Sequence, residues 1–406
     1  MSINIGMSGL KSTTEQMNTI SHNIANVGTI GYKSSRTEFQ DIYAPEFGGG
    51  QMNGVEVAAT RQSFTGGTTT PTGRNSDLAI NGEGFFMVQS NGQQMFTRNG
   101  VMNLDAEGYL VTADGYRLQG YDATDTGQIQ NGTMKDLTVE TGDMPAKTST
   151  KVDLGLNLDA NSSAIDPVAK PFDKEDPTTF TSSATTTVFD SIGGEHEVTQ
   201  YFVKTGDNQW KVHYMLDDAT APTKSVDVAF DAAGKLAAID GNSNANSVDL
   251  NLQLTNGAND LNLAFNISEV SQYGSEFSIN KNAQDGYAPG KLAGWYFETD
   301  GTVYARYSNG QTKAQGQIVL ARFPNQEGLQ QAGGTRWTQS FASGAPLTGV
   351  AGTGQLGALR TGMYEGSNVD LTSEMVGLMS AQSNYQANAK TIQTAQEMTQ
   401  ILFQNL

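Results

Sequence analysis

The first part of the chain repeats its apolar residues at every seventh position. One row consists of Ile3, Leu10, Met17 and Ile24, and a second, half-polar row consists of Gly6, Thr13, Ile20 and Val27. Seven-residue spacing places such residues along one side of an α-helix. The pattern therefore predicts a helix over residues 1–28 with a narrow apolar stripe.

The last part of the chain has the same spacing. Its apolar row consists of Leu371, Leu378, Tyr385 and Ile392. Just upstream, Ser367 and Asp370 fit the S-x-x-D pattern of a helix start, where negative charge is favourable. We expect a second helix over residues 367–406.

The two terminal helices could pair within one subunit or between subunits. Gly, Thr and Gln interrupt both stripes, so an isolated pair would bury little apolar surface to offset the chain entropy lost on folding. Pairing between subunits is therefore favoured, and the helices would become ordered only in a polymer. The expected polymerisation seam comprises Ile3, Leu10, Met17, Ile24, Leu371, Leu378, Tyr385 and Ile392.

The segment SHNIANVGTIGYK, residues 21–33, ends the first helix with a cluster of turn-forming residues. Asn26 and Gly28 would stop the helix, with Gly28 in the left-handed conformation that often closes one. Gly31 would permit a second bend. The candidate helix-exit residues are Asn23, Asn26, Gly28 and Gly31.

The middle of the chain alternates short apolar runs with turn dipeptides. From residue 81 these runs are separated by Asn-Gly, Glu-Gly and Asp-Gly, and the same texture returns with turns at Asp300-Gly301 and Asn309-Gly310. Such dipeptides are typical of β-hairpins. We expect an inner β domain formed by residues 75–145 and 285–366.

A more acidic segment, residues 146–284, separates those two blocks. It contains 9 Lys and 19 Asp or Glu, a net charge of 9 − 19 = −10 out of −18 for the whole chain. We interpret it as an outer β domain inserted into the inner one. The expected fold class is mainly β, with nested β domains and a coiled-coil-like pair of terminal α-helices.

Composition excludes several classes of function. A net charge of −18 would repel nucleic acid, and no apolar run is long enough to insert into a membrane. The first ten residues lack the basic flank and apolar core of a cleavable secretory signal. The absence of cysteine excludes disulfides, zinc–thiolate sites and thiol nucleophiles.

No catalytic, cofactor-binding or metal-binding residues are predicted. Among the three histidines, His196 lies between Glu195 and Glu197, but adjacent residues of a strand point to opposite faces and cannot easily converge on a metal. His22 and His213 are interpreted as structural. The segment 122–128 lacks the spacing of a calcium loop. A secreted β-rich carbohydrate-binding protein or enzyme remains an alternative without a supporting motif.

Long stretches of the sequence resemble the bacterial flagellar rod and hook family. These are SGLKSTTEQMNTISHNIANVGTIGYKSSRTEF near the start, TRNGVMNLDAEGYLVTADGYRLQGY and GTVYARYSNGQTKAQGQIVLARF in the middle, and GSNVDLTSEMVGLMSAQSNYQANAKTIQTAQEM near the end. They occur in the family's order. Val27-Gly28 and Tyr32 depart from commoner choices, and the acidic insert is particular to this chain.

The resemblance implies a structural protein without an active site. Family members leave the cell through the flagellar type III export apparatus and assemble beneath a cap into a tube. Their terminal helices line the central channel, and residues 29–74 would be an extended connector from the helix-exit joint to the β domains. The large insert favours a subunit of the curved hook, which transmits motor torque to the filament, over the alternative of a distal rod subunit.

The implied partners are other copies of the chain, the rod, the hook cap, the hook–filament junction proteins and the export apparatus. No nucleic acid, membrane insertion or cofactor is implied. The implied location is the extracellular part of the bacterial flagellum, reached without a cleavable signal peptide.

Overall fold

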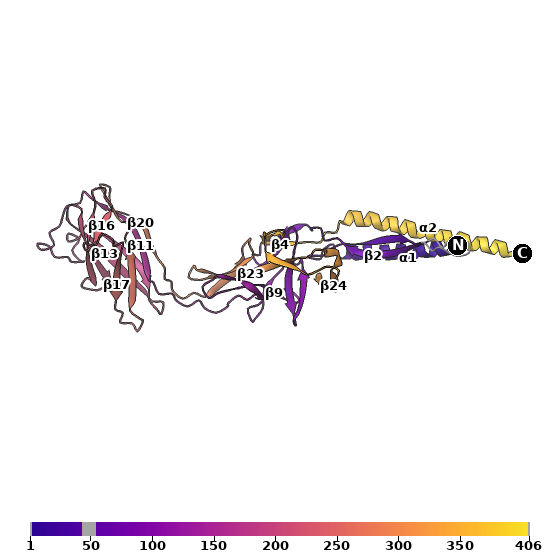
Figure 1. Ribbon diagram of the computed structural model, residues 1–406, viewed down its shortest axis with the longest axis horizontal. Coiled ribbons are helices and arrows are strands. Elements are labelled where there is room, and N and C mark those ends of the chain that lie inside the picture. Colours follow the sequence, from indigo (N-terminus) through magenta and orange to yellow (C-terminus); the bar gives the residue numbers. More distant parts are fainter. Residues whose placement is uncertain (1, 43–53, 405–406) are drawn as a thin grey trace. The chain divides into compact units, whose positions relative to one another are not determined.

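The computed structural model describes residues 2–42 and 54–404, which form two compact units. Unit 1 comprises Met1–Thr141, Ala293–Arg306 and Thr312–Leu406, and unit 2 comprises Gly142–Leu292 and Tyr307–Gln311. The sequence-based boundaries of the insert, 146 and 284, lie a few residues inside unit 2. Figure 1 shows helices at the two chain ends and strands elsewhere, which confirms the expected fold class.

The two helices are α1 (Ser2–Ala25) and α2 (Leu371–Gln404). They lie side by side and antiparallel in unit 1, as Figure 1 shows. The preference for pairing between subunits is therefore corrected, because the helices already pack against each other within one chain. The ends of the predicted helices at residues 1, 405 and 406 lie outside the described residues.

Asp370 starts the second helix. Its carboxylate accepts a hydrogen bond of 3.0 Å from the backbone N–H of Ser373, as an N-cap side chain does. The Ser367 hydroxyl instead accepts a hydrogen bond of 3.2 Å from Val369, outside the helix. The predicted capping role of Ser367 is therefore wrong, and α2 begins at Leu371.

The expected extended connector, residues 29–74, contains a β-hairpin. Strands β1 (Ser35–Asp41) and β2 (Val55–Gln62) pair antiparallel, and residues 43–53 between them lie outside the described residues. The hairpin packs along α1, where the Ser12 hydroxyl donates a 3.1 Å hydrogen bond to the Val55 carbonyl. Ser12 is buried in this contact, which ties the start of β2 to α1.

The rest of unit 1 is built on a large sheet with the strand order β21-β22-β23-β9-β5-β6-β25-β24. Aromatic residues dominate its core, where Phe85, Phe323 and Trp337 are almost fully buried. The predicted hairpin turns are confirmed at Gly301 and Gly310, which have φ of +85° and +80°. The strands of unit 1 after the connector hairpin are β3 (Thr69–Pro71), β4 (Leu78–Asn81), β5 (Phe85–Ser90), β6 (Gln93–Thr97), β7 (Asn103–Leu104), β8 (Leu110–Val111), β9 (Arg117–Ala123), β10 (Ile129–Asp136), β21 (Leu292–Phe297), β22 (Thr302–Tyr307), β23 (Thr312–Arg322), β24 (Gln330–Gly333), β25 (Arg336–Thr338), β26 (Leu347–Val350), β27 (Ala358–Thr361) and β28 (Met363–Glu365).

Unit 2 is a sandwich of two five-stranded sheets. The order is β12-β13-β14-β15-β16 in one and β17-β18-β11-β19 in the other, where β20 also pairs with β11. Alternate residues of both sheets, such as Leu156, Trp210 and Leu263, share one buried apolar core. Its strands are β11 (Lys151–Asp159), β12 (Ser182–Phe189), β13 (Glu195–Gly206), β14 (Gln209–Leu216), β15 (Lys224–Phe230), β16 (Leu236–Ile239), β17 (Ser247–Leu252), β18 (Leu261–Asn266), β19 (Ser271–Tyr273) and β20 (Ser278–Gln284).

Candidate functional site: the helix pair and its joint

Small residues bring α1 and α2 close together. A Cβ added at Gly6 would lie 2.7 Å from Cγ1 of Ile392, and one added at Gly9 would lie 2.7 Å from Oδ1 of Asn388. Both distances are shorter than real Cβ contacts. At Gly9 the end of the Asn388 side chain could move away, whereas at Gly6 a larger side chain meets the branched Ile392 and the Asn388 carbonyl at 3.5 Å and would push the helices apart. The contact face of α1 is therefore the half-polar row of the sequence pattern, in which Thr13 and Ile20 are buried.

The structure distributes the eight predicted seam residues over different environments. Ile3, Leu10, Met17 and Ile24 are half-buried, as are Leu378 and Ile392 of α2. Leu371 and Tyr385 remain 43% and 40% exposed. The eight residues do not form one buried seam within the chain, and their role between subunits stays a prediction. Helical spacing of Gly6 and Gly9 with Thr13 was the sequence signal for the observed contact face.

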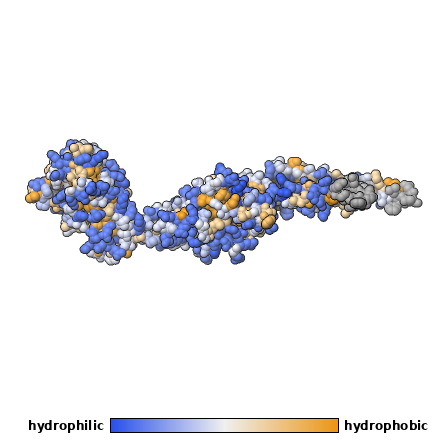
Figure 2. All heavy atoms as spheres, in the orientation of Figure 1, coloured by the Kyte–Doolittle hydropathy of each residue, from blue (hydrophilic) through white to orange (hydrophobic). Residues whose placement is uncertain are grey.

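One row of α2 is apolar but uncovered. Leu371, Met375 and Met379 follow one another at four-residue spacing, and Met379 is 62% exposed. Val376, Met398 and Ile401 add exposed apolar surface on the same helix. Figure 2 shows hydrophobic residues at the surface along this helical part of unit 1. Clustered apolar exposure of this kind marks an interaction surface. We call Leu371, Met375 and Met379 the α2 face.

Asn23 connects three segments where α1 ends. Its side-chain amide donates hydrogen bonds of 2.8 Å to the Ser35 carbonyl and 2.8 Å to the Glu374 carboxylate. Its side-chain oxygen accepts from the Ser35 N–H at 2.9 Å and from the Tyr32 hydroxyl at 3.2 Å. The residue is 1% exposed. This predicted helix-exit residue thus ties α1 to the start of the hairpin and to the first turn of α2.

The other predicted helix-exit residues, Asn26, Gly28 and Gly31, have conformations and contacts that differ in part from the prediction. The Asn26 backbone N–H still bonds the His22 carbonyl at 3.2 Å, and its side chain accepts from the Thr29 hydroxyl at 3.0 Å. Gly31, with φ of +68°, has the left-handed conformation, and its added Cβ would lie 2.7 Å from the Asn99 nitrogen. Gly28 has neither a positive φ nor a neighbour within 4 Å of an added Cβ. The predicted left-handed role of Gly28 is therefore wrong, and Gly31 has that role.

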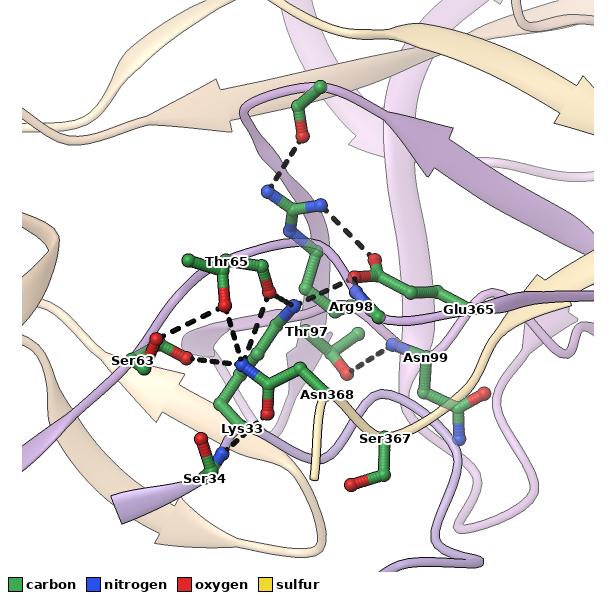
Figure 3. Close-up of polar contacts among 12 residues, drawn as sticks. Lys33, Ser34, Ser63, Thr65, Thr97, Arg98, Asn99, Glu365, Ser367 and Asn368 are labelled. Carbon is green, nitrogen blue, oxygen red and sulfur yellow. Dashed lines mark hydrogen bonds and ion pairs between the residues drawn. The ribbon is translucent and has the colours of Figure 1, made fainter. Parts of the chain in front are cut away.

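A buried charge cluster fastens the start of the connector, at Lys33, to the β-strands (Figure 3). Lys33 Nζ lies 2.7 Å from Oε1 of Glu365, and Arg98 Nη1 lies 3.1 Å from Oε2. All three side chains are at most 2% exposed. Lys33 also donates to the Thr65 carbonyl at 2.7 Å, and Arg98 donates to the Gly82 carbonyl at 3.0 Å. One carboxylate therefore holds two cations from distant parts of the sequence.

Burial dominates the electrostatics of this cluster. It lowers the pKa of the Lys33 ammonium, while the Glu365 carboxylate acts in the opposite direction. Burial likewise lowers the pKa of Arg98. Removing Glu365 would leave two cations without their shared counter-charge, which is costly in a buried site.

Asn368 adds neutral hydrogen bonds beside the charges. Its side-chain oxygen accepts from the Ser34 N–H at 2.7 Å, and its amide donates to the Ser63 carbonyl at 2.8 Å. Gly67 N–H donates to Glu365 at 2.8 Å. We use the name joint for the segments Gly31–Ser35, Ser63–Gly67 and Glu365–Asn368 together with Asn23 and Arg98. The separation of its parts in the sequence explains why sequence patterns did not identify its charge cluster.

A surface cavity of about 440 Å³ opens beside the joint. Its lining includes Tyr32, Lys33, Arg336 and Trp337, and it contains no carboxylate, histidine or cysteine among its lining residues. The ammonium of Lys33 is held by Glu365 and by the Thr65 carbonyl.

His196 of unit 2 contacts two carboxylates other than its sequence neighbours. Its Nδ1 lies 2.8 Å from Asp217 and its Nε2 lies 3.2 Å from Asp190. Burial alone would lower the pKa of His196, but these contacts raise it. Both ring nitrogens are therefore engaged, and the described residues contain no group of acidic residues, histidines or cysteines placed to hold a metal ion. Neither described helix has the length and apolarity needed to cross a membrane.

Models of four protein families match successive parts of the chain. They are "Flagella basal body rod protein" over residues 3–33, "Flagellar hook protein FlgE/F/G D1 domain" over 79–159, "Flagellar basal body protein FlaE D2 domain" over 157–287 and "Flagellar basal body rod FlgEFG protein C-terminal" over 360–405. The first and last cover segments that contain the helices, and the D2 match lies entirely within unit 2.

Relatives named as hook proteins match the chain over almost its whole length. The flagellar hook protein FlgE of Escherichia coli strain K12 is 40% identical, with 99% of each chain covered. The hook protein of Salmonella typhimurium is also 40% identical with the same coverage, and that of Rhizobium meliloti is 33% identical over 98% of this chain and 97% of its own. The crystal structure of Helicobacter pylori FlgE2 has a similar fold, with a TM-score of 0.54, 16% identity, and coverage of 72% of this chain and 99% of that one.

Proposed function

The chain belongs to the flagellar hook protein family, whose members are structural subunits of the hook, and from this premise we propose how it builds its part of the flagellum. Copies of the chain polymerise into a curved, flexible tube that transmits torque from the motor to the filament for motility. The alternatives of a distal rod subunit and of a secreted carbohydrate-binding protein or enzyme are set aside, since the full-length relatives named above are hook proteins.

The observation that carries polymerisation is the uncovered α2 face. Leu371, Met375 and Met379 form an apolar row that nothing in the described part of the chain covers. Burying such a side chain is worth roughly 1.5–3 kcal/mol. Neighbouring subunits would gain that free energy at every contact, so the face favours assembly of many copies.

The joint supports the mechanical part of the proposal. Load applied to the helices reaches the β-strands through Asn23, the Lys33–Glu365–Arg98 cluster and Asn368. Buried, hydrogen-bonded charge pairs resist displacement, because separating them leaves uncompensated charge in the interior. A subunit with this joint passes torque between its helical and β parts while remaining folded.

The remaining elements of the proposal follow from the family. The subunit would act without enzymatic activity, leave the cell through the type III export apparatus without a cleavable signal peptide, and assemble under a hook cap. Its neighbours would be the rod on one side and the hook–filament junction proteins on the other.

Electron microscopy of the purified subunit under salting-out conditions tests the proposal. We expect tubes, and we expect Met379→Asp to raise the critical concentration for assembly by at least about tenfold, since each 1.4 kcal/mol corresponds to a factor of ten and a carboxylate is costly in an apolar contact. The melting temperature of the monomer should stay nearly constant, because Met379 is 62% exposed.

Ser380→Asp is the matched control, since Ser380 is the exposed polar neighbour of Met379 on α2. It should assemble nearly as well as the unaltered chain. An unaltered chain that stays monomeric under all salting-out conditions contradicts the proposal. Leu378→Asp and Ile392→Asp are less informative, because both residues are half-buried within the chain and their loss would also disturb the monomer.

A further inference from the structure

A long uncharged segment lies at the surface of unit 1. No Asp, Glu, Lys or Arg occurs between Arg336 and Arg360, and no other stretch between two charged residues of the chain is as long. The segment is largely at the surface: Phe341, Ala342 and Leu347 are exposed. The exposed residues of the segment are Gln339, Phe341, Ala342, Ala345, Leu347, Thr348, Gly352, Thr353, Gly354, Gln355 and Ala358. We call them the neutral surface.

Phe341 is the most prominent residue of the neutral surface. Its side chain is fully exposed, although burying an aromatic side chain removes a large apolar area from water. An exposed aromatic residue within a long uncharged stretch is unusual in so acidic a chain, and it therefore indicates a contact surface. A single exposed apolar residue needs no explanation, but here it stands in the longest uncharged stretch of a chain with a net charge of −18.

Hydrogen bonds hold the loop that carries Phe341 in one conformation. Ser343 is 0% exposed, and its hydroxyl accepts from the Ser340 N–H at 3.0 Å and donates to the Ser340 carbonyl at 2.9 Å. The Ser340 hydroxyl accepts from the Ala342 N–H at 3.0 Å. The Asn325 amide donates to the Ala342 carbonyl at 3.0 Å. The aromatic ring is thus presented on an ordered loop, which reduces the entropy that binding would cost.

We propose that the neutral surface is a contact between copies of this chain, with Phe341 as its central anchor. This rests on the proposed polymerisation and adds a second contact, in the β part of unit 1, to the α2 face. Two copies that each carry a net charge of −18 repel one another wherever charged surfaces meet. The neutral surface adds no charge of its own, and the charged residues beside β26, Arg322 and Glu83, offset each other in an ion pair, so copies can approach there at low electrostatic cost.

The chemistry of the segment fits such a contact. Charged residues are depleted at the centre of protein interfaces, and aromatic residues are enriched there. The Gly, Ala, Ser and Thr residues around Phe341 allow close approach of another backbone. We propose a head-to-tail contact, in which the neutral surface of one copy meets a different patch of the next copy, because only such a contact generates the helical polymer that the proposed function requires. The neutral surface then adds no charge to its side of the contact.

The first experiment measures assembly of the full chain carrying Phe341→Ser. We expect its critical concentration to rise by at least about tenfold, as for loss of an interface anchor, with an unchanged monomer melting temperature. Val168→Ser is the matched control, because Val168 is 87% exposed in unit 2, outside the neutral surface. It should assemble like the unaltered chain. Equal critical concentrations for all three proteins overturn the inference.

A second experiment reports burial directly. The chain contains no cysteine, so Ala342→Cys introduces a unique exposed thiol next to Phe341, and Val168→Cys introduces one in unit 2. We expect a maleimide to label both thiols in monomers. In polymers, the Val168→Cys thiol should be labelled at an unchanged rate and the Ala342→Cys thiol much more slowly. Rapid labelling of the Ala342→Cys thiol in polymers overturns the proposed contact.

The possible failures are distinguishable. An unaltered chain that does not polymerise contradicts the proposed function itself. Normal polymers from Phe341→Ser together with loss of motility in cells contradict the inference and assign the neutral surface to a different flagellar partner.

Discussion

Glu365 lies between two buried cations, and the joint depends on it more than on any surface ion pair. Glu365→Gln keeps the size of the side chain but leaves Lys33 and Arg98 without their shared carboxylate. Breaking a buried ion pair by removing one partner costs roughly 3–5 kcal/mol. We expect that loss in the free energy of unfolding of the full chain, measured by chemical denaturation.

Glu83→Gln provides the comparison at an exposed site. Glu83 pairs with Arg322, but its side chain is 54% exposed, and such pairs contribute at most about 1 kcal/mol. Similar small losses in both variants would show that the buried cluster contributes little to stability.

For individual residues, sequence patterns located the end of α1 but did not give the role of each residue there. The glycines of residues 21–33 predicted two bends, and the structure places bends there. Which glycine is left-handed depends on tertiary contacts: Gly31 approaches the Asn99 backbone, whereas Gly28 has open space around it. The charge cluster was beyond sequence reasoning, since Lys33 and Glu365 are 332 residues apart and no local pattern indicates that they pair.

The helix pair depends on the smallest side chains of α1. Gly6→Leu should separate α1 from α2 at this point, because even its Cβ would lie 2.7 Å from Ile392. Leucine favours helix formation more than glycine does, so a loss of order would reflect packing and not propensity. We expect faster cleavage of both helices in limited proteolysis of the monomer, with unit 2 unaffected.

Gly377→Ala on α2 is the control for that change. Its Cβ would lie 3.5 Å from Ile20, an ordinary contact, and Ala in place of a helical Gly gains up to about 1 kcal/mol. This variant should be cleaved no faster than the unaltered chain. Equal protection of the helices in Gly6→Leu would mean that the pair tolerates a wider separation.

Both terminal helices could be predicted because heptad spacing is a local signal. The packing partner of each helix could not be predicted, because a narrow apolar stripe fits contact with a helix of the same chain as well as contact with a neighbouring chain. Gly6 and Gly9 permit the close approach of α1 to α2. In the heptad pattern, however, glycine counts as a weak apolar residue, so these positions did not indicate the contact. The β1–β2 hairpin was missed for a similar reason: its strands are separated by a long Gly-rich stretch, residues 43–54, instead of a short turn dipeptide.

Nesting of one unit within another is the feature of the whole molecule that composition predicted best. The change from Asn-Gly hairpins to an acidic, Arg-free segment lies close to the limits of unit 2. Unit 2 also has its own core, formed by both of its sheets. What the sequence lacked was any local signal for parallel pairing of β11 with β18 and β19, because those strands are far apart along the chain.

Unit 2 should therefore be dispensable for the tube but not for its shape. Its two connections meet where Met144 and Gly290 exchange backbone hydrogen bonds of 2.7 and 3.0 Å. Replacing residues 145–289 by Asn-Gly would join these two segments through a tight turn and leave the aromatic core of unit 1 intact. The α2 face and the joint remain in the shortened chain, so we expect it to polymerise at a similar concentration.

We propose that unit 2 contacts unit 2 of neighbouring copies and so sets the curvature of the tube. The polymers of this deletion variant should therefore be straighter or stiffer than those of the full chain. Electron microscopy measures their curvature, and circular dichroism of the monomer checks that unit 1 is folded. Adding Met379→Asp to the shortened chain should again suppress assembly, which would show that both polymers use the α2 face. A shortened chain that folds but does not assemble would place unit 2 within the tube's essential scaffold, and curvature could then no longer be separated from assembly.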